Sequence, residues 1–388
     1  MDGTDEAGGE VDGMTSDSAD ATIEVSGVVQ HAAWQERTLP PVERLATDLW
    51  SIPVPMPPIS PLRYVSVYVL TGDSGVTLID AGWDSDEAWD ALRGGLAELG
   101  ASIADVRGCL VTHQHFDHIG LARRIREDSD AWIALHPADR DVIIAPDFRD
   151  RLRASDADVR WLVRLGAGAE EAERLRGRHQ SGGDVRGTFA LPDRLVEDGD
   201  VLELPGWLLR AVHTPGHTPG HLCFAAPHRR LFFAGDHVLP RISPNITADR
   251  RPGVDALGDF LTSLEKVAGE DVDEVLPAHE WRFRGLSDRT NQLRAHHEAR
   301  LAELVEVIAA DPGGVPWDFA GGLTWSRSWD QYDGHMRVSA VNETAAHLVH
   351  LVERGVVVAS DDDVPRYRLA HAHGLTVAAD VGESGVRG

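Results

Sequence analysis

The sequence predicts an α/β fold with a smaller helical part at its C-terminal end. Three observations predict it. From about Ala46, short apolar runs alternate with helical patterns; Gly, Pro and Asp-Gly turns then separate a second series of short runs; and amphipathic helical stretches follow beyond about Thr290. Strands alternating with helices indicate helices packed on sheets. The length of 388 residues suits one large domain plus a smaller one.

The first half of the chain contains the clearest alternation. Apolar runs predict strands at 49–55, 62–72, 75–83, 107–115 and 131–137. The segments between them predict helices at 85–100 and 119–128. In the first helix, Ala88, Leu92 and Leu96 fall near one face, and Gly100 suits its C-terminal stop.

An arginine-rich segment, 145–190, interrupts this pattern and reads as helical around 158–166 and 169–178. It holds nine arginines and eight acidic residues. Such a near balance predicts an exposed helical hairpin laced with ion pairs rather than a basic binding patch. The alternative is a lid over the active site.

The second half continues with strands and ends in helices. Runs bounded by turn residues predict strands at 194–206, 207–217, 221–227, 229–238 and 274–281. Apolar stripes at helical spacing predict helices at 291–310 and 339–355, and two strand-like pieces follow at 356–360 and 366–370. Helices followed by a two-stranded wing suggest a small winged-helix domain.

Composition limits the classes of partner. Acidic residues outnumber basic ones 63 to 37, for a formal net charge of −26, which disfavours binding to nucleic acid or to anionic membrane. Two cysteines in apolar runs fit a reducing compartment. No apolar stretch approaches the ~20 residues of a membrane span, and no signal peptide is evident, so we expect a cytoplasmic protein. Residues 1–25 and 373–388 are expected to be a disordered acidic tail and a flexible tail.

The stretch VTHQHFDHIG, residues 111–120, concentrates three histidines and an aspartate at the end of an apolar run. Along a strand, His113 and His115 would point to the same face, while Asp117 and His118 would follow in the turn and reach a second point in space. Imidazole and carboxylate suit Zn²⁺, and the absence of cysteine ligands argues against a purely structural zinc site.

Three further segments offer groups of the same kind, each at a junction between strand and loop. AVHTPGHTPGH provides His213, His217 and His221, LFFAGDHV provides Asp236, and EVLPAHEW provides His279. The preceding strands could direct these side chains at the cluster in residues 113–118.

Together, HQHFDH at 113–118, HTPGH at 213–217, GD at 235–236, PAH at 277–279 and the upstream IDAG at 79–82 resemble the metallo-β-lactamase superfamily of αββα hydrolases. Their order and spacing resemble its glyoxalase II-like branch. The resemblance implies an αββα domain over 40–288, with 145–190 as a helical insert or lid. It also implies a helical, winged-helix domain over 289–372, similar to a segment appended in one branch of the superfamily.

The resemblance also implies a ligand set for two zinc ions, with Fe or Mn as alternatives. His113, His115 and His217 would hold the first ion, and Asp117, His118 and His279 the second. Asp236 would bridge both. His213 and His221 match no ligand and are expected to support the ligands, as is Asp80 in IDAG; His237, beside Asp236, is a candidate for substrate contact.

The function that the resemblance implies is a zinc-dependent hydrolase in which a metal-bridging hydroxide attacks a thioester or related small acyl substrate. Asp117 and Asp236 would be the catalytic carboxylates. Substrate recognition groups are expected among Arg241, Asn245, Trp281, Arg282, Arg284 and the insert, with Tyr332 and His335 reaching in from the second domain.

Three alternatives stay open. The winged-helix branch includes an endoribonuclease, but five arginines face seven acids between Trp325 and Ala370, so a basic recognition face is missing. Lactone or β-lactam hydrolysis would use the same attack on a carbonyl. Flavodiiron relatives use a similar ligand set for redox chemistry, but no flavin-binding region is visible.

A winged helix without positive charge suits packing or formation of a homodimer.

Overall fold

The computed structural model describes residues 23–58, 60–145, 156–179, 189–251 and 253–370. Most of the expected tail 1–25 and all of the tail 373–388 lie outside these residues. Residues 24 and 25, at the end of the first expected tail, form strand β1 (Glu24–Val25), which pairs antiparallel with β14 (Phe283–Arg284).

Two seven-stranded sheets form the centre of the molecule. The first has the order β2 (Glu43–Ala46), β3 (Leu49–Pro55), β4 (Tyr64–Gly72), β5 (Gly75–Ile79), β6 (Val106–Leu110), β7 (Trp132–Leu135), β8 (Arg194–Leu195). Neighbours are antiparallel from β2 to β5 and parallel from β5 to β8.

The second sheet has the order β1, β14, β13 (Glu274–Pro277), β12 (Leu231–Gly235), β11 (Leu222–Ala226), β10 (Trp207–His213), β9 (Val201–Leu204). Its strands are antiparallel except for β12 and β13, which run parallel. Because these two strands run in the same direction, Asp236 and His279 leave the sheet at the same edge.

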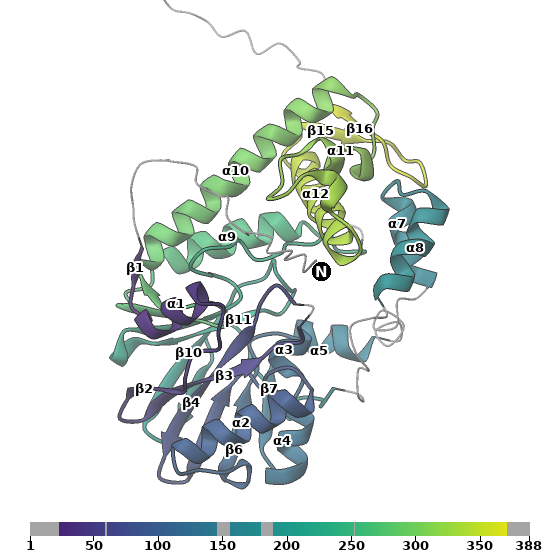
Figure 1. Cartoon of the computed structure of the whole chain (residues 1–388). Coiled ribbons are helices and arrows are strands. Elements are labelled where there is room, and N and C mark those ends of the chain that lie inside the picture. The colour runs from purple at the N-terminus through teal and green to yellow at the C-terminus, as the bar shows by residue number, and fades with distance from the viewer. Residues whose placement is uncertain (1–22, 59, 146–155, 180–188, 252, 371–388) are drawn as a thin grey trace, which may run out of the picture.

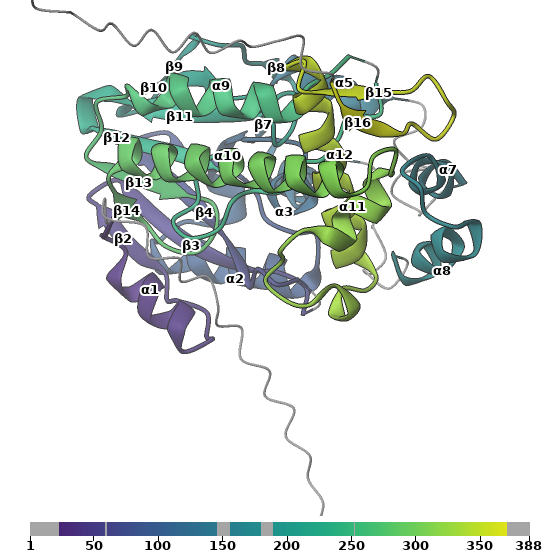
Figure 2. The same cartoon turned by 90° about the horizontal axis from the view of Figure 1, so that it is seen from above.

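Helices cover the outer face of each sheet. Against the first sheet lie α2 (Asp86–Glu98) and α4 (Ala122–Ser129), and against the second lie α9 (Ala256–Ala268) and α10 (Leu286–Ala310). Figures 1 and 2 show the two sheets stacked between these two pairs of helices. Helix α12 (His335–Glu353) packs on α9 and α10 beyond the ends of the strands. The remaining helices are α1 (Val28–Gln35), α3 (Phe116–Ile119), α5 (Pro137–Ile144), α7 (Asp156–Arg164), α8 (Ala169–His179) and α11 (Pro316–Gly322).

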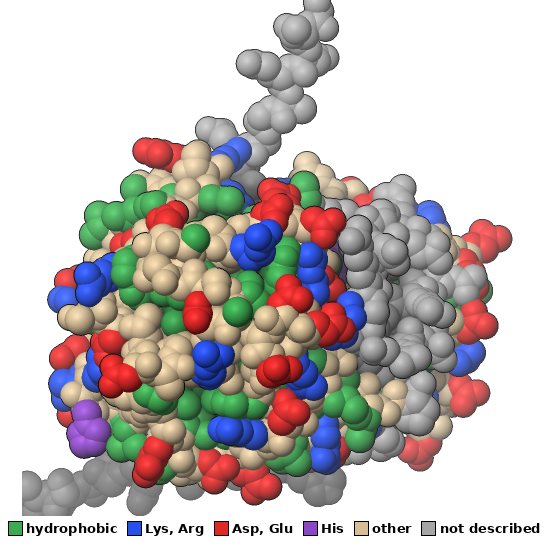
Figure 3. Space-filling model, turned by 90° about the horizontal axis from the view of Figure 1, so that it is seen from below, with side chains coloured by type: hydrophobic (Ala, Val, Ile, Leu, Met, Phe, Trp, Pro, Cys, Tyr) green, Lys and Arg blue, Asp and Glu red, His purple; other side chains and the backbone are tan. Residues whose placement is uncertain are grey.

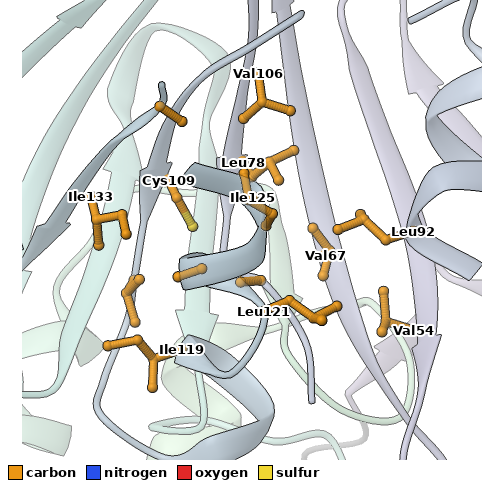
Figure 4. Packing of buried hydrophobic residues seen from close by; sticks show 14 of the residues in the cluster. Val54, Val67, Leu78, Leu92, Val106, Cys109, Ile119, Leu121, Ile125 and Ile133 are labelled. Atoms are coloured by element: carbon orange, nitrogen blue, oxygen red, sulfur yellow. The ribbon is translucent and has the colours of Figure 1, made fainter. Parts of the chain in front are cut away.

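Alternation along the strands produces the layers. On β4, Val65, Val67 and Val69 face α2 and α4, whereas Tyr68 and Leu70 face the second sheet. Figure 4 shows the first of these cores, where side chains of the sheet meet those of α2 and α4. The expected α/β class, with two sheets between helices, is thereby confirmed.

One expected strand is shorter than its apolar run suggests. The run 107–115 predicts a strand that includes His113 and His115, but β6 ends at Leu110. The amide of Thr112 bonds to Asp80 Oδ1 at 2.8 Å, and its carbonyl accepts from Leu222 N at 2.8 Å. These bonds draw the chain out of the ladder, so both histidines lie in a loop.

The insert is less exposed than its charge balance suggests. Helices α7 and α8 form a hairpin, but Leu162, Leu165 and Leu175 are buried, and neighbours include Trp317 and Val338 of the C-terminal part. Ion pairs also cross to other segments, between Arg174 and Asp333 at 2.9 Å and between Arg250 and Asp158. The expected helical hairpin with ion pairs is present and most of its charged side chains are exposed, but one apolar face is buried against the C-terminal part. The role of 145–190 as a lid stays a prediction.

The C-terminal part shares its core with the second sheet. Leu293 and Leu304 of α10 and Leu348 of α12 belong to the same buried cluster as Phe232 and Val275 of the sheet. A two-stranded sheet of β15 (Val357–Ala359) and β16 (Tyr367–Leu369) follows, as the sequence predicts. Its identity as a winged helix stays a prediction. Among the described residues, no helix combines the length and apolar character that crossing a membrane requires.

Candidate metal centre

The loop after β6 carries the first four of the expected ligands. His115 precedes α3 as its N-cap residue and has an extended backbone conformation. Asp117 and His118 lie within the single turn of α3 that follows. The amide of His118 bonds to the carbonyl of His115 at 3.0 Å. Figure 1 places α3 at the end of the strands that lies nearer to α12.

The other three expected ligands lie in segments that leave strands of the second sheet. His217 lies in the loop between β10 and β11, Asp236 directly follows β12, and His279 follows β13 after one residue. His213 is the last residue of β10, and His217 and His221 lie in the loop that follows; of the three, only His217 joins the cluster. Strand ends from both sheets therefore converge on one point, where α/β folds commonly carry their sites.

All seven expected ligands come together. Three sets have their ligand atoms mutually within 4.8 Å: His113, His115 and His217; His113, His118 and Asp236; and Asp117, His118 and His279. Asp236 lies between them, with Oδ2 3.5 Å from His217 Nε2 and Oδ1 3.3 Å from His279 Nε2.

The chemistry of this cluster fits divalent cations. His118 Nε2, His217 Nε2, His279 Nε2 and Asp236 Oδ1 are all buried and have no hydrogen-bond partner among the described residues. A buried polar atom without a partner is costly, and four of them pointing at one another need a common ligand. Imidazole nitrogens and carboxylate oxygens are the donors that zinc, iron and manganese accept.

Each of three imidazoles is oriented by the nitrogen that faces away from the cluster. His118 Nδ1 donates to Asp80 Oδ2 at 2.8 Å, His279 Nδ1 to the carbonyl of Tyr64 at 2.8 Å, and His217 Nδ1 to the carbonyl of Asn245 at 2.9 Å. Because Nδ1 is fixed as a donor, Nε2 is the nitrogen that is left to bind a cation, which would displace any proton that it carries. Asp80 thus orients His118, one of the expected ligands, and belongs to none of the three sets of grouped ligand atoms.

The buried carboxylates of the cluster shift the pKa values of the imidazoles beside them. Burial opposes ionisation of Asp117, but the imidazoles of His118 and His279 outweigh it and lower the pKa of Asp117 to about 2. Burial likewise disfavours a charged His279, yet the carboxylates of Asp236 and Asp117 raise its pKa to about 10. His115 has less carboxylate nearby, and burial with neighbouring imidazoles lowers its pKa to about 3. The carboxylates therefore create a strongly cation-attracting centre around His118 and His279.

The additional histidines have supporting positions. His221 Nδ1 bonds to Thr214 Oγ1 at 2.8 Å, and its Nε2 accepts from the amide of Asp236 at 3.1 Å, which holds the backbone of that residue. His213 stacks on His136 with ring centroids 4.0 Å apart. His237 is fully buried against Phe260, so the expected contact with substrate is not available in this conformation.

Asp139 is a functional residue that the sequence reasoning missed. From the buried face of α5 it accepts hydrogen bonds from Gln114 N at 2.9 Å, Thr218 Oγ1 at 2.9 Å and Gly220 N at 2.6 Å. It therefore ties the loop of His113 and His115 to the loop of His217. Burial raises the pKa of Asp139 to about 6, although the three bonds partly offset this effect.

The expected recognition groups are only partly available. Trp281 and Arg282 are buried, and Arg282 pairs with Glu274 at 2.7 Å and Glu43 at 3.1 Å. Arg284 pairs with Glu24 at the sheet edge, and Tyr332 is buried against Ser326. Arg241 keeps 45% of its side chain exposed while it pairs with Glu280 and stacks over Trp34. The sequence could not distinguish these because ion pairing depends on distant residues.

Two stacked sheets between helices, with histidines and aspartates gathered at the strand ends, define a class of metal-using hydrolases. The chain belongs to the metallo-beta-lactamase superfamily, whose family model matches residues 60–279. The family confirms the expected resemblance at this level, and with the His/Asp groups it implies use of a metal.

Similar proteins in sequence include thioesterases. Acyl-coenzyme A thioesterase MBLAC2 from Gallus gallus is 28% identical over 221 residues, which are 55% of this chain and 72% of that protein. Atrochrysone carboxyl ACP thioesterase AgnL7 from Paecilomyces divaricatus is 36% identical over 123 residues, 31% of this chain and 37% of that protein. Lactamase-like protein aptB from Emericella nidulans is 30% identical over 129 residues, 33% of this chain. The matched segment spans only 39% of the length of aptB.

Solved structures resemble a larger part of the chain. A beta-lactamase domain protein from Burkholderia ambifaria has a TM-score of 0.72 and 26% identity, with 90% of this chain and 98% of that one covered. A metallo-beta-lactamase family protein from Thermus thermophilus has a TM-score of 0.69 and 29% identity, with 84% and 100% covered. The likeness therefore extends beyond the segment that the family model matches.

Proposed function

We propose that this protein is a hydrolase with two metal ions that cleaves a thioester or a related small acyl substrate. The convergence of all seven expected side chains on one buried point carries this proposal. In the ligand order and the spacing of its motifs, the chain fits the glyoxalase II-like branch. The alternatives are a lactone or β-lactam hydrolase and a phosphodiesterase.

The residues divide into two sets around Asp236. His113, His115 and His217 would hold one cation, and Asp117, His118 and His279 the other, with Asp236 reaching both. Zinc suits these donors, and iron or manganese are also compatible. When bound, such cations act as Lewis acids that polarise a carbonyl oxygen and supply a nucleophile at neutral pH.

The chain's own residues contribute orientation and proton handling. Asp80, Tyr64 and Asn245 hold three imidazoles with Nδ1 protonated, which leaves Nε2 as the coordinating atom. Asp117 Oδ2 lies 3.2 Å from His279 Nε2 and its side chain is 13% exposed, so it can meet a solvent or substrate proton. We assign to Asp117 and Asp236 the anchoring of the nucleophile and the acceptance of its proton.

The acyl substrate is supported by two observations. Two similar proteins are named as thioesterases, one for acyl-coenzyme A and one for an acyl carrier protein. The net charge of −26 disfavours a polynucleotide, and the face in Figure 3 mixes acidic and basic side chains without a broad basic patch. A homodimer, a winged-helix domain and a cytoplasmic location stay predictions.

A panel of substrates tests this proposal. Zinc-loaded protein is assayed on acyl-CoA, S-lactoylglutathione, homoserine lactone, nitrocefin and bis-p-nitrophenyl phosphate, beside an Asp236→Ala control. We expect turnover of the thioesters, and loss of both metal and rate in the control. Turnover of the phosphodiester alone, or full activity of metal-free Asp236→Ala, would overturn the proposal.

A further inference from the structure

The loop between Asp236 and α9 contacts both the metal centre and the helices α10 and α12. Its Asn245 carbonyl accepts the Nδ1 proton of His217 at 2.9 Å. Because this acceptor is a backbone atom, the orientation of His217 depends on where the loop lies. Asn245 is exposed, so its side chain does little to fix that position.

Helices α10 and α12 provide the fixed points of this loop. Arg289 of α10 donates to the carbonyls of Leu239 at 2.7 Å and Ile242 at 2.9 Å. Further along, the amide of Ala248 donates to the carbonyl of Asn342 on α12 at 3.3 Å. Between these points, the hydroxyl of Ser243 lies 3.0 Å from His297 Nε2 on α10.

His297 is the start of a buried chain of polar groups. Its Nδ1 lies 3.2 Å from His347 Nε2 on α12, and His347 Nδ1 lies 2.8 Å from the carbonyl of Glu343. The exposed fractions of His297 and His347 are 1% and 3%. Side chains so deeply buried need every polar atom satisfied.

The direction of each hydrogen bond follows from the last acceptor. A carbonyl cannot donate, so His347 must carry its proton on Nδ1, and its Nε2 accepts. His297 then donates from Nδ1, and its Nε2 accepts in turn. The donor to His297 is therefore Ser243, whose other contact, the carbonyl of Pro244 at 3.3 Å, is longer. The opposite direction would place two lone pairs against each other at His347.

Both imidazoles are neutral at physiological pH, which this direction requires. Burial lowers the pKa of His297 to about 2 and that of His347 to about 4, and neighbouring imidazoles add to the effect. A neutral pair keeps one donor and one acceptor on each ring, so the chain has a single consistent arrangement.

We propose that Ser243, His297 and His347 are positioning residues: a one-directional relay through which α10 and α12 hold the Asn245 carbonyl against His217. This assignment rests on the proposed function only for the role of His217 as a metal ligand. The C-terminal part thereby completes a metal centre whose ligands all lie before residue 280.

Ser243→Ala tests the relay, with Ser243→Thr as the variant that keeps the hydroxyl. Thr344→Ala is the matched control, because Thr344 is buried on α12 and donates only within its own helix, to Ala340 at 2.8 Å. The first readout is nitrogen NMR of the histidine tautomers in metal-free protein. The second is zinc affinity, measured by competition with a chelator.

We expect Nδ1–H tautomers at His297 and His347, and a shifted Nε2 resonance of His297 in Ser243→Ala. Mutation of a residue that orients a metal ligand without touching the metal typically lowers metal affinity about 10- to 100-fold. Because the relay acts through the loop, we expect a loss near about tenfold in Ser243→Ala, recovery in Ser243→Thr, and no loss in Thr344→Ala.

An Nε2–H tautomer at His297 would overturn the relay, as would unchanged zinc affinity in Ser243→Ala or an equal loss in Thr344→Ala. These readouts do not involve a substrate. A protein that shows the expected tautomers and affinities but hydrolyses no thioester would contradict the proposed function and leave the relay intact.

Discussion

Asp80→Asn is the substitution that most specifically perturbs one half of the metal centre. Asp80 is 1% exposed and accepts from Thr112 N, Thr112 Oγ1 and His118 Nδ1. Its φ of +63° lies in the left-handed region, which Asn adopts as readily as Asp. The backbone is therefore unaffected, and the change is confined to one carboxylate oxygen that becomes an amide NH₂.

That NH₂ would face His118 Nδ1 and could only donate to it. His118 would then carry its proton on Nε2, the atom that points at Asp117 and Asp236. We expect zinc affinity of the set Asp117, His118 and His279 to fall about 10- to 100-fold, roughly 1.4–2.8 kcal/mol. The set His113, His115 and His217 should be affected less.

The assay is a zinc titration against a chelator that resolves two binding steps. Asp130→Asn serves as the matched control, since Asp130 also has a left-handed φ of 58° but is exposed at the end of α4. Two binding steps of wild-type affinity in Asp80→Asn would refute the argument that Asp80 sets the tautomer of His118.

Three further predictions concern His347, Gly216 and Trp161. Burial gives His347 a pKa of about 4 in the folded protein, below its ordinary 6.5, so its stabilising contribution is present above about pH 6.5 and is lost as pH falls toward 4. In urea titrations, the difference in unfolding free energy between wild type and His347→Gln should therefore shrink by about 2 kcal/mol from pH 7 to pH 5. A difference that stays constant would contradict this prediction. Gly216 has a φ of +133°, and a Cβ at this position would lie 2.5 Å from Phe260. Gly216→Ala should therefore lower the unfolding free energy by about 2–4 kcal/mol and also lower the zinc content. Unchanged zinc content would count against the rigid placement of His217. The indole N–H of Trp161 donates to Asn342 Oδ1 at 2.7 Å, which joins α7 to α12. Trp161→Phe removes this hydrogen bond and should accelerate limited proteolysis of the insert. An unchanged cleavage rate would show that this bond does not hold the insert.

The sequence predicts most of the strands and the seven residues that the structure brings together, but not the contacts that hold those residues in place. Apolar runs and turn residues place most strands, because burial on one or both faces dictates their composition. Helices α1, α5, α9 and α11 are not among the predicted elements. Helices α1, α5 and α11 are short, and the burial of α1 depends on a partner far away in the chain, Trp281. Helix α9 differs, because its buried residues Leu257, Phe260 and Leu264 follow helical spacing after the N-cap Asp255, a pattern that the sequence does carry.

The supports of the metal centre are long-range contacts that no local pattern marks. Asp139 is an ordinary acidic residue in PADRD until the fold brings Gln114 and Gly220 to it. Likewise His297 lies in the apolar stripe of one predicted helix and His347 lies in the next predicted helix, and only the packing of α10 against α12 pairs them. The predicted strand 107–115 is longer than β6 because composition cannot show that Asp80 accepts a hydrogen bond from the amide of Thr112.

Counting and locating bound metal tests the central proposal most directly. Crystals grown with zinc should show two anomalous peaks per chain, one among His113, His115 and His217 and one among Asp117, His118 and His279, with Asp236 between them. A single peak, or none at saturating zinc, would contradict the two-metal centre.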